Sequence, residues 1–273
     1  MSVTLNAKAM ESVFRKTMPE DMSRLIVYLT AGDPTLEATG ELLQAVDRGG
    51  ADLIELGVPF SDPMADGEVI QRASERALRA GATLSAILAR LPEWRKSVQA
   101  PMILFSYYNP VLQYGHERFA GTLARAGGQG ALIVDLSPEE AGPYVRAMRE
   151  DKMDTVFLAS PASPDERLER ISHLSSAFLY LISRPGVTGE RTSLSKEVAP
   201  LVQRVRRFTK LPVAVGFGLS NPAQVREVQS LADAAVVGSA VVRAIEERYA
   251  SEGAQAIEEF VCWLKSGTGS RPE

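Results

Sequence analysis

Short apolar segments alternate with amphipathic segments along the whole chain. Each apolar segment is rich in Val, Ile, Leu and Ala, and is followed by a turn and then by a stretch with helical periodicity. The pattern predicts strands at 25–30, 52–56, 101–105, 131–135, 154–158, 177–182, 212–215 and 233–237. It predicts helices at 36–48, 68–80, 83–97, 116–126, 139–150, 165–174, 195–208 and 221–230. Strands that are almost continuously apolar are typical of a parallel sheet covered on both faces.

Eight strand–helix units in strict alternation predict an α/β fold, a (β/α)8 barrel of the TIM type. At 273 residues the chain fits one such domain, spanning 1–273. We expect an extra helix at 3–17 before the first strand and two helices after the second strand, broken at Gly81. A helical stretch at 239–265, interrupted near Gly253, follows the last strand. An open, doubly wound sheet is the alternative arrangement.

Composition narrows the class of partner. The net charge is −4, with 30 basic and 34 acidic residues mixed along the chain, which argues against nucleic acid or an anionic membrane as partner. No apolar window approaches the ~20 residues of a membrane span. The single cysteine excludes an internal disulfide. We expect a cytoplasmic enzyme.

The segment 53–67, LIELGVPFSDPMADG, offers two candidate catalytic carboxylates. Leu53 and Glu55 alternate onto the same face of the second strand, so Glu55 points into the barrel if Leu53 does. Asp66 follows on a loop stiffened by two prolines. One carboxylate on a strand and another on a loop can perform general acid–base chemistry. The alternative is a solvated Glu at the end of a strand and an Asp that caps the next helix, as Asp33 and Thr35 are expected to do after the first strand.

Glycine-rich segments after the last two strands predict a phosphate site. These segments read GFGLSNP and VVGSAVV, and each leads into a predicted helix. Gly218 and the pair Gly238 and Ser239 would therefore bring backbone N–H groups and helix N-termini to an anion, joined by Gly189 from the polar segment 183–194. That segment suits a lid over the site. For any one of these glycines the alternative is a tight turn.

Several chemistries are disfavoured by what the strand ends lack. No lysine follows a strand, so a Schiff base is disfavoured, and His116 and His173 fall on predicted helices without metal-ligand spacing. We therefore expect a site with no metal and no cofactor. Aromatic residues at or near the strand ends would line it, or belong to the core: Tyr28, Phe105, Tyr107, Tyr180 and Phe217.

Taken together, seven motifs resemble the α subunit family of tryptophan synthase. In chain order they are YLTAGDP, IELGVPFSDPMADG, YYNP, DLSPEE, SRPGVTG, GFGLSNP and VVGSAVV, and the similarity runs from about Phe14 to Trp263. The resemblance implies cleavage of indole-3-glycerol phosphate to indole and glyceraldehyde 3-phosphate, with Glu55 as general acid–base and Asp66 at the indole N–H.

The same resemblance assigns further roles around the site. Gly189, Gly218, Gly238 and Ser239 would hold the phosphate, Thr188 would belong to the lid, and Tyr107 and Tyr180 would lie at the indole pocket. The family works as a heterotetramer, α2β2, with the β subunit of tryptophan synthase. Asp62 and Asn109 are the candidate contacts with that partner.

Three positions depart from the family pattern: Glu68 and Ser137 replace common prolines, and Val134 precedes Asp135 where a proline is frequent. These departures affect the loops and not the candidate catalytic groups. A free-standing lyase that needs no β subunit is one alternative, and the unusual Glu68 is the feature that suggests it. A non-catalytic barrel acting as a scaffold is another, and a phosphosugar isomerase or epimerase on the same scaffold is the enzymatic alternative.

Overall fold

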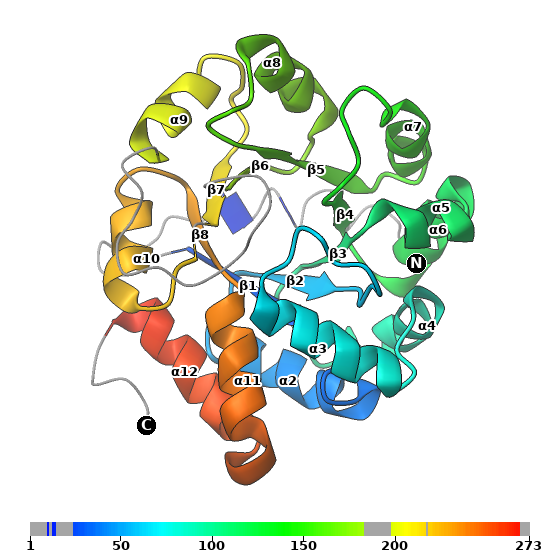
Figure 1. Cartoon of the computed structure of the whole chain (residues 1–273), viewed down its shortest axis with the longest axis vertical. Helices are drawn as coiled ribbons and strands as arrows, with labels where there is room; N and C mark the ends of the chain where they lie inside the picture. The colour runs from blue at the N-terminus through cyan, green and yellow to red at the C-terminus, as the bar shows by residue number, and fades with distance from the viewer. Residues whose placement is uncertain (1–9, 11–12, 15–23, 183–197, 217, 268–273) are drawn as a thin grey trace.

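The computed structural model describes residues 10, 13–14, 24–182, 198–216 and 218–267. Its eight strands form one closed parallel barrel in sequence order, with β8 paired to β1 (Figure 1). The strands are β1 (Leu25–Thr30), β2 (Leu53–Gly57), β3 (Met102–Ser106), β4 (Gly130–Ile133), β5 (Asp154–Ala159), β6 (Leu179–Ile182), β7 (Val213–Gly216) and β8 (Ala234–Val237). The predicted (β/α)8 barrel is confirmed, and the open sheet is wrong.

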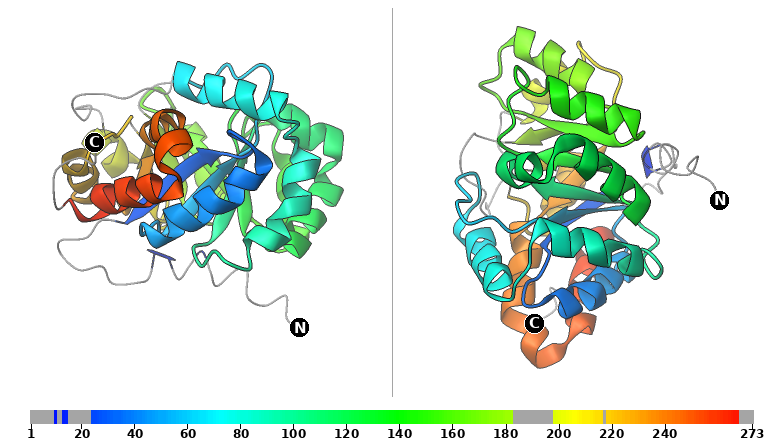
Figure 2. Two further views of the ribbon diagram at one scale, coloured as in Figure 1. Left: turned by 90° about the horizontal axis from the view of Figure 1, so that it is seen from below. Right: turned by 90° about the vertical axis from the view of Figure 1, so that its right-hand side faces the viewer.

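Helices surround the strands, as Figures 1 and 2 show. They are α2 (Leu36–Arg48), α3 (Glu68–Arg79), α4 (Leu84–Trp94), α5 (Tyr108–Tyr114), α6 (His116–Ala126), α7 (Gly142–Glu150), α8 (Asp165–Leu174), α9 (Val198–Val205), α10 (Pro222–Gln229), α11 (Ser239–Glu252) and α12 (Ala254–Ser266). The two helices after β2 and the two after β8 are therefore present. None of the helices in the described part of the chain is long and apolar enough to cross a membrane.

Two apolar layers hold the barrel together. The inner layer fills the barrel with alternate strand residues, among them Ile26, Leu53, Ile103, Leu132 and Val156, each at most 1% exposed. The outer layer lies between the strands and the helices that cover them. Because neighbouring strand residues point to opposite faces, both faces must be apolar, and this is why the strands read as continuous apolar runs.

The structure differs from the sequence prediction at one short helix. α5 follows β3 directly, although Pro110 in this segment favours a break. Pro110 is the third residue of α5, in the first turn, where backbone N–H groups have no partner inside the helix and proline is tolerated. The predicted helix at 3–17 lies outside the described residues except for Met10, Val13 and Phe14.

The loop after β1 also differs in part. Thr35 caps α2 as expected, because its hydroxyl accepts a hydrogen bond from the Ala38 N–H at 3.1 Å. Asp33, which we expected to act as a cap, instead accepts two hydrogen bonds from the Arg76 guanidinium at 2.7 and 2.9 Å. Arg76 also pairs with Glu246, so the ion pairs join the β1 loop to α3 and α11.

Candidate active site

Glu55 lies inside the barrel on β2. The register pairs it with Tyr28 on β1 and with Ile103 on β3, and its side chain is fully buried. Neither carboxyl oxygen has a hydrogen-bond partner among the described residues. Burial without a partner disfavours the charged form, so desolvation raises the pKa of Glu55 from 4.5 to about 8. Glu55 is therefore a carboxylic acid that keeps its proton near neutral pH.

Asp66 lies on the loop between β2 and α3 and is 6% exposed. One of its carboxyl oxygens accepts a hydrogen bond from the Tyr107 hydroxyl at 3.1 Å. Burial raises the pKa of Asp66 to about 6, and the hydrogen bond from Tyr107 opposes that rise. Asp66 therefore ionises about two units below Glu55 and is mostly a carboxylate at neutral pH.

Tyr107 ties the loop that carries Asp66 to the end of β3. Besides donating to Asp66, its hydroxyl accepts a hydrogen bond from the Ala65 N–H at 3.0 Å. The ring of Phe60 stacks on the ring of Tyr107, with 4.9 Å between the centroids. Three residues of the same loop, Phe60, Ala65 and Asp66, thus contact Tyr107, and these contacts set the orientation of the Asp66 carboxylate.

The helix after the loop begins beside Asp66. Gly67 is the N-cap of α3, and Glu68 is its first residue. The Gln71 side-chain amide donates to the Asp66 carbonyl oxygen at 2.8 Å. A negative Glu68 at the helix N-terminus is favourable to the helix dipole. Glu68 therefore adds negative charge at the start of α3, and the Gln71 side chain ties the helix to the backbone of Asp66.

Aromatic rings surround the two carboxyl groups. Tyr28 and Phe105 meet edge to face at 5.3 Å, and both Tyr28 and Tyr180 are buried. Glycines on the adjacent strands make room for the tyrosine rings: a Cβ on Gly57 would lie 2.3 Å from the Tyr28 hydroxyl, and one on Gly216 would lie 2.5 Å from the Tyr180 hydroxyl.

Charge also acts on these tyrosines. Burial and the nearby carboxylates raise the pKa of Tyr28 and of Tyr180 well above the ordinary value. Both hydroxyls therefore remain neutral. Phe217, the fifth predicted pocket residue, lies outside the described residues.

Of the predicted phosphate residues, three are described. Gly238 is the N-cap of α11 and Ser239 is its first residue, directly after β8. Gly218 follows β7 with a φ of +70°, a conformation that favours glycine. These residues therefore follow adjacent strands, next to a helix N-terminus. Gly189 and the lid residue Thr188 lie outside the described residues.

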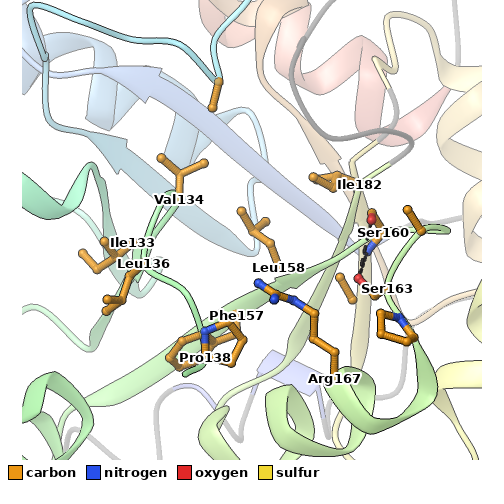
Figure 3. Close-up of a pocket in the computed structure, with 14 residues that line it drawn as sticks. Ile133, Val134, Leu136, Pro138, Phe157, Leu158, Ser160, Ser163, Arg167 and Ile182 are labelled. Atoms are coloured by element: carbon orange, nitrogen blue, oxygen red, sulfur yellow. Dashed lines mark hydrogen bonds between the residues drawn. The ribbon is translucent and has the colours of Figure 1, made fainter. Parts of the chain in front are cut away.

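A cavity of about 500 Å³ opens at the ends of β4, β5 and β6 (Figure 3). Its inner wall is formed by Val134, Leu158 and Ile182, and Ala65 from the loop of Asp66 also borders it. This aliphatic wall was not predicted, because the pocket residues expected from the sequence were all aromatic. The signal was present, since each wall residue follows an inward-pointing residue by two positions, the period of a strand.

The candidate partner residues are exposed. Asp62 lies on the loop of Asp66, and Asn109 lies on α5 beside Tyr107. Between the two carboxylates of that loop, Met64 is 86% exposed, an unusual position for a large apolar side chain. Within the described ranges, no group of His, Cys, Asp and Glu side chains is arranged to hold a metal ion.

The fold and the site together define a parallel barrel of the TIM type with two buried carboxyl groups of different pKa toward the carboxyl ends of its strands, an arrangement suited to acid–base chemistry. A family model described as tryptophan synthase alpha chain matches residues 14–267. The tryptophan synthase alpha chain of Solibacter usitatus is 53% identical over 92% of this chain and 95% of the relative.

Solved structures give the same result. The chain is similar to a Mycobacterium tuberculosis tryptophan synthase structure, with a TM-score of 0.87 and 37% identity, over 94% of this chain and 97% of that one. A tryptophan synthase complex from Pyrococcus furiosus has a TM-score of 0.81 and 37% identity, over 89% of this chain and 98% of that one. The chain belongs to the tryptophan synthase alpha chain family. It is thus a carbon–carbon lyase of tryptophan biosynthesis that cleaves indole-3-glycerol phosphate to indole and glyceraldehyde 3-phosphate.

Proposed function

We propose that Glu55 and Asp66 perform this cleavage, Glu55 as the general acid–base and Asp66 as the carboxylate beside the indole nitrogen. The observation that carries the proposal is the difference between their pKa values, about 8 for Glu55 and about 6 for Asp66. Near neutral pH, a proton donor and an anion are present together at one end of the barrel. The cleavage needs one of each.

The reaction requires a proton at carbon 3 of the indole ring before the carbon–carbon bond breaks, because an indole carbanion is a poor leaving group. Glu55 donates that proton, and the ring nitrogen becomes positively charged. The negative charge of Asp66 stabilises this cation as it forms.

Glu55, now a carboxylate, accepts the proton of the adjacent glycerol hydroxyl. The bond between carbon 3 and the glycerol carbon breaks, and its electron pair returns to the ring. The hydroxyl oxygen becomes the aldehyde oxygen of glyceraldehyde 3-phosphate. Glu55 regains its proton in this step, so it enters the next cycle in the form in which it began.

Binding of the substrate is assigned to the residues around the carboxyl groups. Gly189, Gly218, Gly238 and Ser239 hold the phosphate through backbone N–H groups and a helix N-terminus. The indole ring lies among Tyr28, Phe105, Tyr107, Tyr180 and Phe217, and Thr188 belongs to the lid. The support from the structure is that Tyr28 contacts Phe105 and that a Cβ placed on Gly238 would lie 3.5 Å from the Tyr28 Cβ.

The partner that we propose is the β subunit of tryptophan synthase, in an α2β2 tetramer. The exposed side chains of Asp62 and Met64, on the loop that carries Asp66, and of Asn109, in the first turn of α5, are available for that contact. The similarity to the Pyrococcus furiosus tryptophan synthase complex supports an assembly of this kind. A cytoplasmic location stays a prediction from the sequence.

The test is indole release from indole-3-glycerol phosphate by the purified chain, with and without a tryptophan synthase β subunit. We expect slow indole release by the chain alone and a rise of at least about tenfold with the β subunit. The reason is that binding of the β subunit would hold the loop that carries Asp66 in its active position. Fast release that the β subunit does not change would instead support a free-standing lyase. Release in neither condition would leave only a non-catalytic barrel.

A further inference from the structure

Asp33 is a buried carboxyl group that the reaction described above does not use. It lies on the loop after β1 and is 3% exposed, and its two carboxyl oxygens accept hydrogen bonds from the Arg76 guanidinium at 2.7 and 2.9 Å. A buried ion pair of this kind adds little stability beyond what apolar side chains of the same size would give. Its position at the catalytic end of the barrel therefore points to a role other than stability.

Arg76 also reaches across to α11. Its guanidinium donates to Glu246 at 2.7 Å, and Arg72, one turn earlier on α3, donates to the two oxygens of Glu246 at 2.9 and 2.8 Å. The hydrogen bonds from Arg72 and Arg76 lower the pKa of Glu246 to about 2, so Glu246 is a carboxylate at any pH near neutral. The four side chains of Asp33, Arg72, Arg76 and Glu246 thus form a bridge between the β1 loop, α3 and α11.

This bridge joins the two helices that begin at the two ends of the proposed substrate site. Figure 1 shows α3 and α11 side by side. α3 begins just after Asp66, whose carbonyl oxygen accepts a hydrogen bond from the Gln71 side chain at 2.8 Å. α11 begins at Ser239, with Gly238 as its N-cap, where the phosphate is proposed to bind. The bridge therefore connects the indole end of the site to its phosphate end.

An apolar contact lies between the same two helices. Val242 of α11 belongs to one buried cluster with Ile70 and Ala73 of α3. Ser239, Val242 and Glu246 are spaced by three and four residues, so they share one face of α11. The face of α11 that begins at the proposed phosphate site thus packs against α3 and is then ion-paired with it.

The spacing between the two helices matters for a substrate that is held at both ends. Indole-3-glycerol phosphate has its ring nitrogen at one end and its phosphate at the other, and the carbon–carbon bond that breaks lies between them. A misplacement of about 1 Å can reduce the rate about a hundredfold, because the reacting groups lose their alignment. A ligand that is held at the phosphate end alone has no such requirement.

We propose that Arg76 is a positioning residue for this reaction, which holds the phosphate-binding end of α11 in a fixed place relative to the loop of Asp66. Arg76 is suited to this role because its Nε and Nη2 donate to Asp33 while its Nη1 donates to Glu246. The single ammonium group of a lysine could not hold both partners in this planar arrangement. The inference rests on the proposed function, because it uses the substrate ends assigned to Asp66 and to the start of α11.

The experiment compares Arg76→Gln with Arg79→Gln in the full chain. Arg79 is the matched control, because it is an exposed arginine of the same helix that pairs with Glu75 within α3 at 3.3 Å. The measurements are kcat and KM for indole-3-glycerol phosphate, and the inhibition constant Ki of glycerol 3-phosphate, which has the phosphate end of the substrate without the indole ring. In Arg76→Gln, kcat should fall at least about tenfold while Ki stays within about twofold of wild type. Arg79→Gln should leave both within about twofold.

The split between kcat and Ki separates positioning from simple support of the fold. An unchanged kcat in Arg76→Gln, or a Ki that rises in proportion to the loss of kcat, overturns the inference. In the second case Arg76 would support the phosphate site alone. No cleavage by the wild-type chain overturns the proposed function and this inference with it, so the two failures are distinguishable.

A second variant decides if Arg76→Gln does not fold, since that change leaves Asp33 buried without its partner. Glu246→Ala removes the link to α11 and keeps the pair of Asp33 and Arg76. It should show the same split, with kcat at least about fivefold lower and Ki within about twofold of wild type. Glu247→Ala, at an exposed neighbouring position of α11, is its control. Equal kcat in Glu246→Ala and Glu247→Ala overturns the inference.

Discussion

Glu55 and Asp66 are the same chemical group in two different settings at one end of the barrel. Glu55 is on a strand, is fully buried and has no hydrogen-bond partner among the described residues, and its pKa is about 8. Asp66 is on a loop and accepts a hydrogen bond from Tyr107, and its pKa is about 6. The difference shows how one barrel obtains an acid and an anion from two carboxyl groups. On the strand, Glu55 has no hydrogen-bond partner among the described residues, whereas the loop brings Asp66 to the hydroxyl of Tyr107 at the end of β3.

The largest expected effect comes from removing the acid. Glu55→Gln keeps the size of the side chain but has no proton to donate to carbon 3, so kcat should fall by about 10²–10⁴. The measurement is indole release at saturating substrate. Glu68→Gln is the matched control, because it removes an exposed glutamate at the start of α3 and should change kcat by less than about twofold. A Glu55→Gln protein as active as the wild type would contradict the role of Glu55.

The next effect tests the other half of the comparison. Asp66→Asn keeps the size of the side chain and an oxygen that can accept a hydrogen bond. It loses the charge that stabilises the indole cation, so kcat should fall by about 10²–10³. The pH profile gives a sharper readout than the rate alone. Wild-type activity should fall below pH about 6, where Asp66 becomes protonated, and above pH about 8, where Glu55 loses its proton.

In Asp66→Asn the acidic limb should disappear while the alkaline limb remains. Retention of the acidic limb in this variant would assign it to another group.

The sequence was sufficient to predict the direction of the Glu55 side chain, but not the hydrogen-bond partners that distinguish Glu55 from Asp66. Alternation along β2 predicted that Glu55 points inward with Leu53, because the period of a strand is a local property. The absence of a partner for Glu55 is not local, since it depends on which side chains the neighbouring strands place beside it. A raised pKa of Glu55 could therefore be expected from the sequence. The difference between the pKa values of Glu55 and Asp66 could not.

Other contacts between residues far apart in the sequence were also not predictable from local patterns. The cap formed by Thr35 was predictable because its partner is three residues away, whereas Asp33 pairs with Arg76, which is 43 residues away. The seven-residue α5 was not predicted, and its Pro110 is tolerated because it lies in the first turn of the helix. The cavity beside the site could not be predicted from the sequence for a related reason. Its wall joins three strands and belongs to no single motif.

A smaller effect concerns stability. The pKa of Glu55 is higher in the folded protein, about 8, than its ordinary value of 4.5. Unfolding therefore releases a proton between these values, and the free energy of unfolding should decrease as the pH rises through this window. The decrease due to Glu55 should be about 3 kcal/mol between pH about 5 and pH about 8.

Urea unfolding of wild type and Glu55→Gln across this pH range measures the contribution of Glu55 to the free energy of unfolding. The difference between the two proteins should grow in favour of the variant as the pH rises. A constant difference would show that Glu55 ionises normally in the folded protein.

The smallest effect isolates the contact that makes Asp66 unlike Glu55. Tyr107→Phe removes the hydroxyl that donates to Asp66 and accepts from the Ala65 N–H, while the ring that stacks on Phe60 is kept. Without that donor the pKa of Asp66 should rise, so the acidic limb of the pH profile should move upward by up to about one unit, toward the value of Glu55. The alkaline limb should not move, because Glu55 receives no hydrogen bond from Tyr107. An equal fall in rate at every pH would mean that Tyr107 only supports the loop. A shift of the acidic limb alone would mean that this hydrogen bond contributes part of the difference between the pKa values of Asp66 and Glu55.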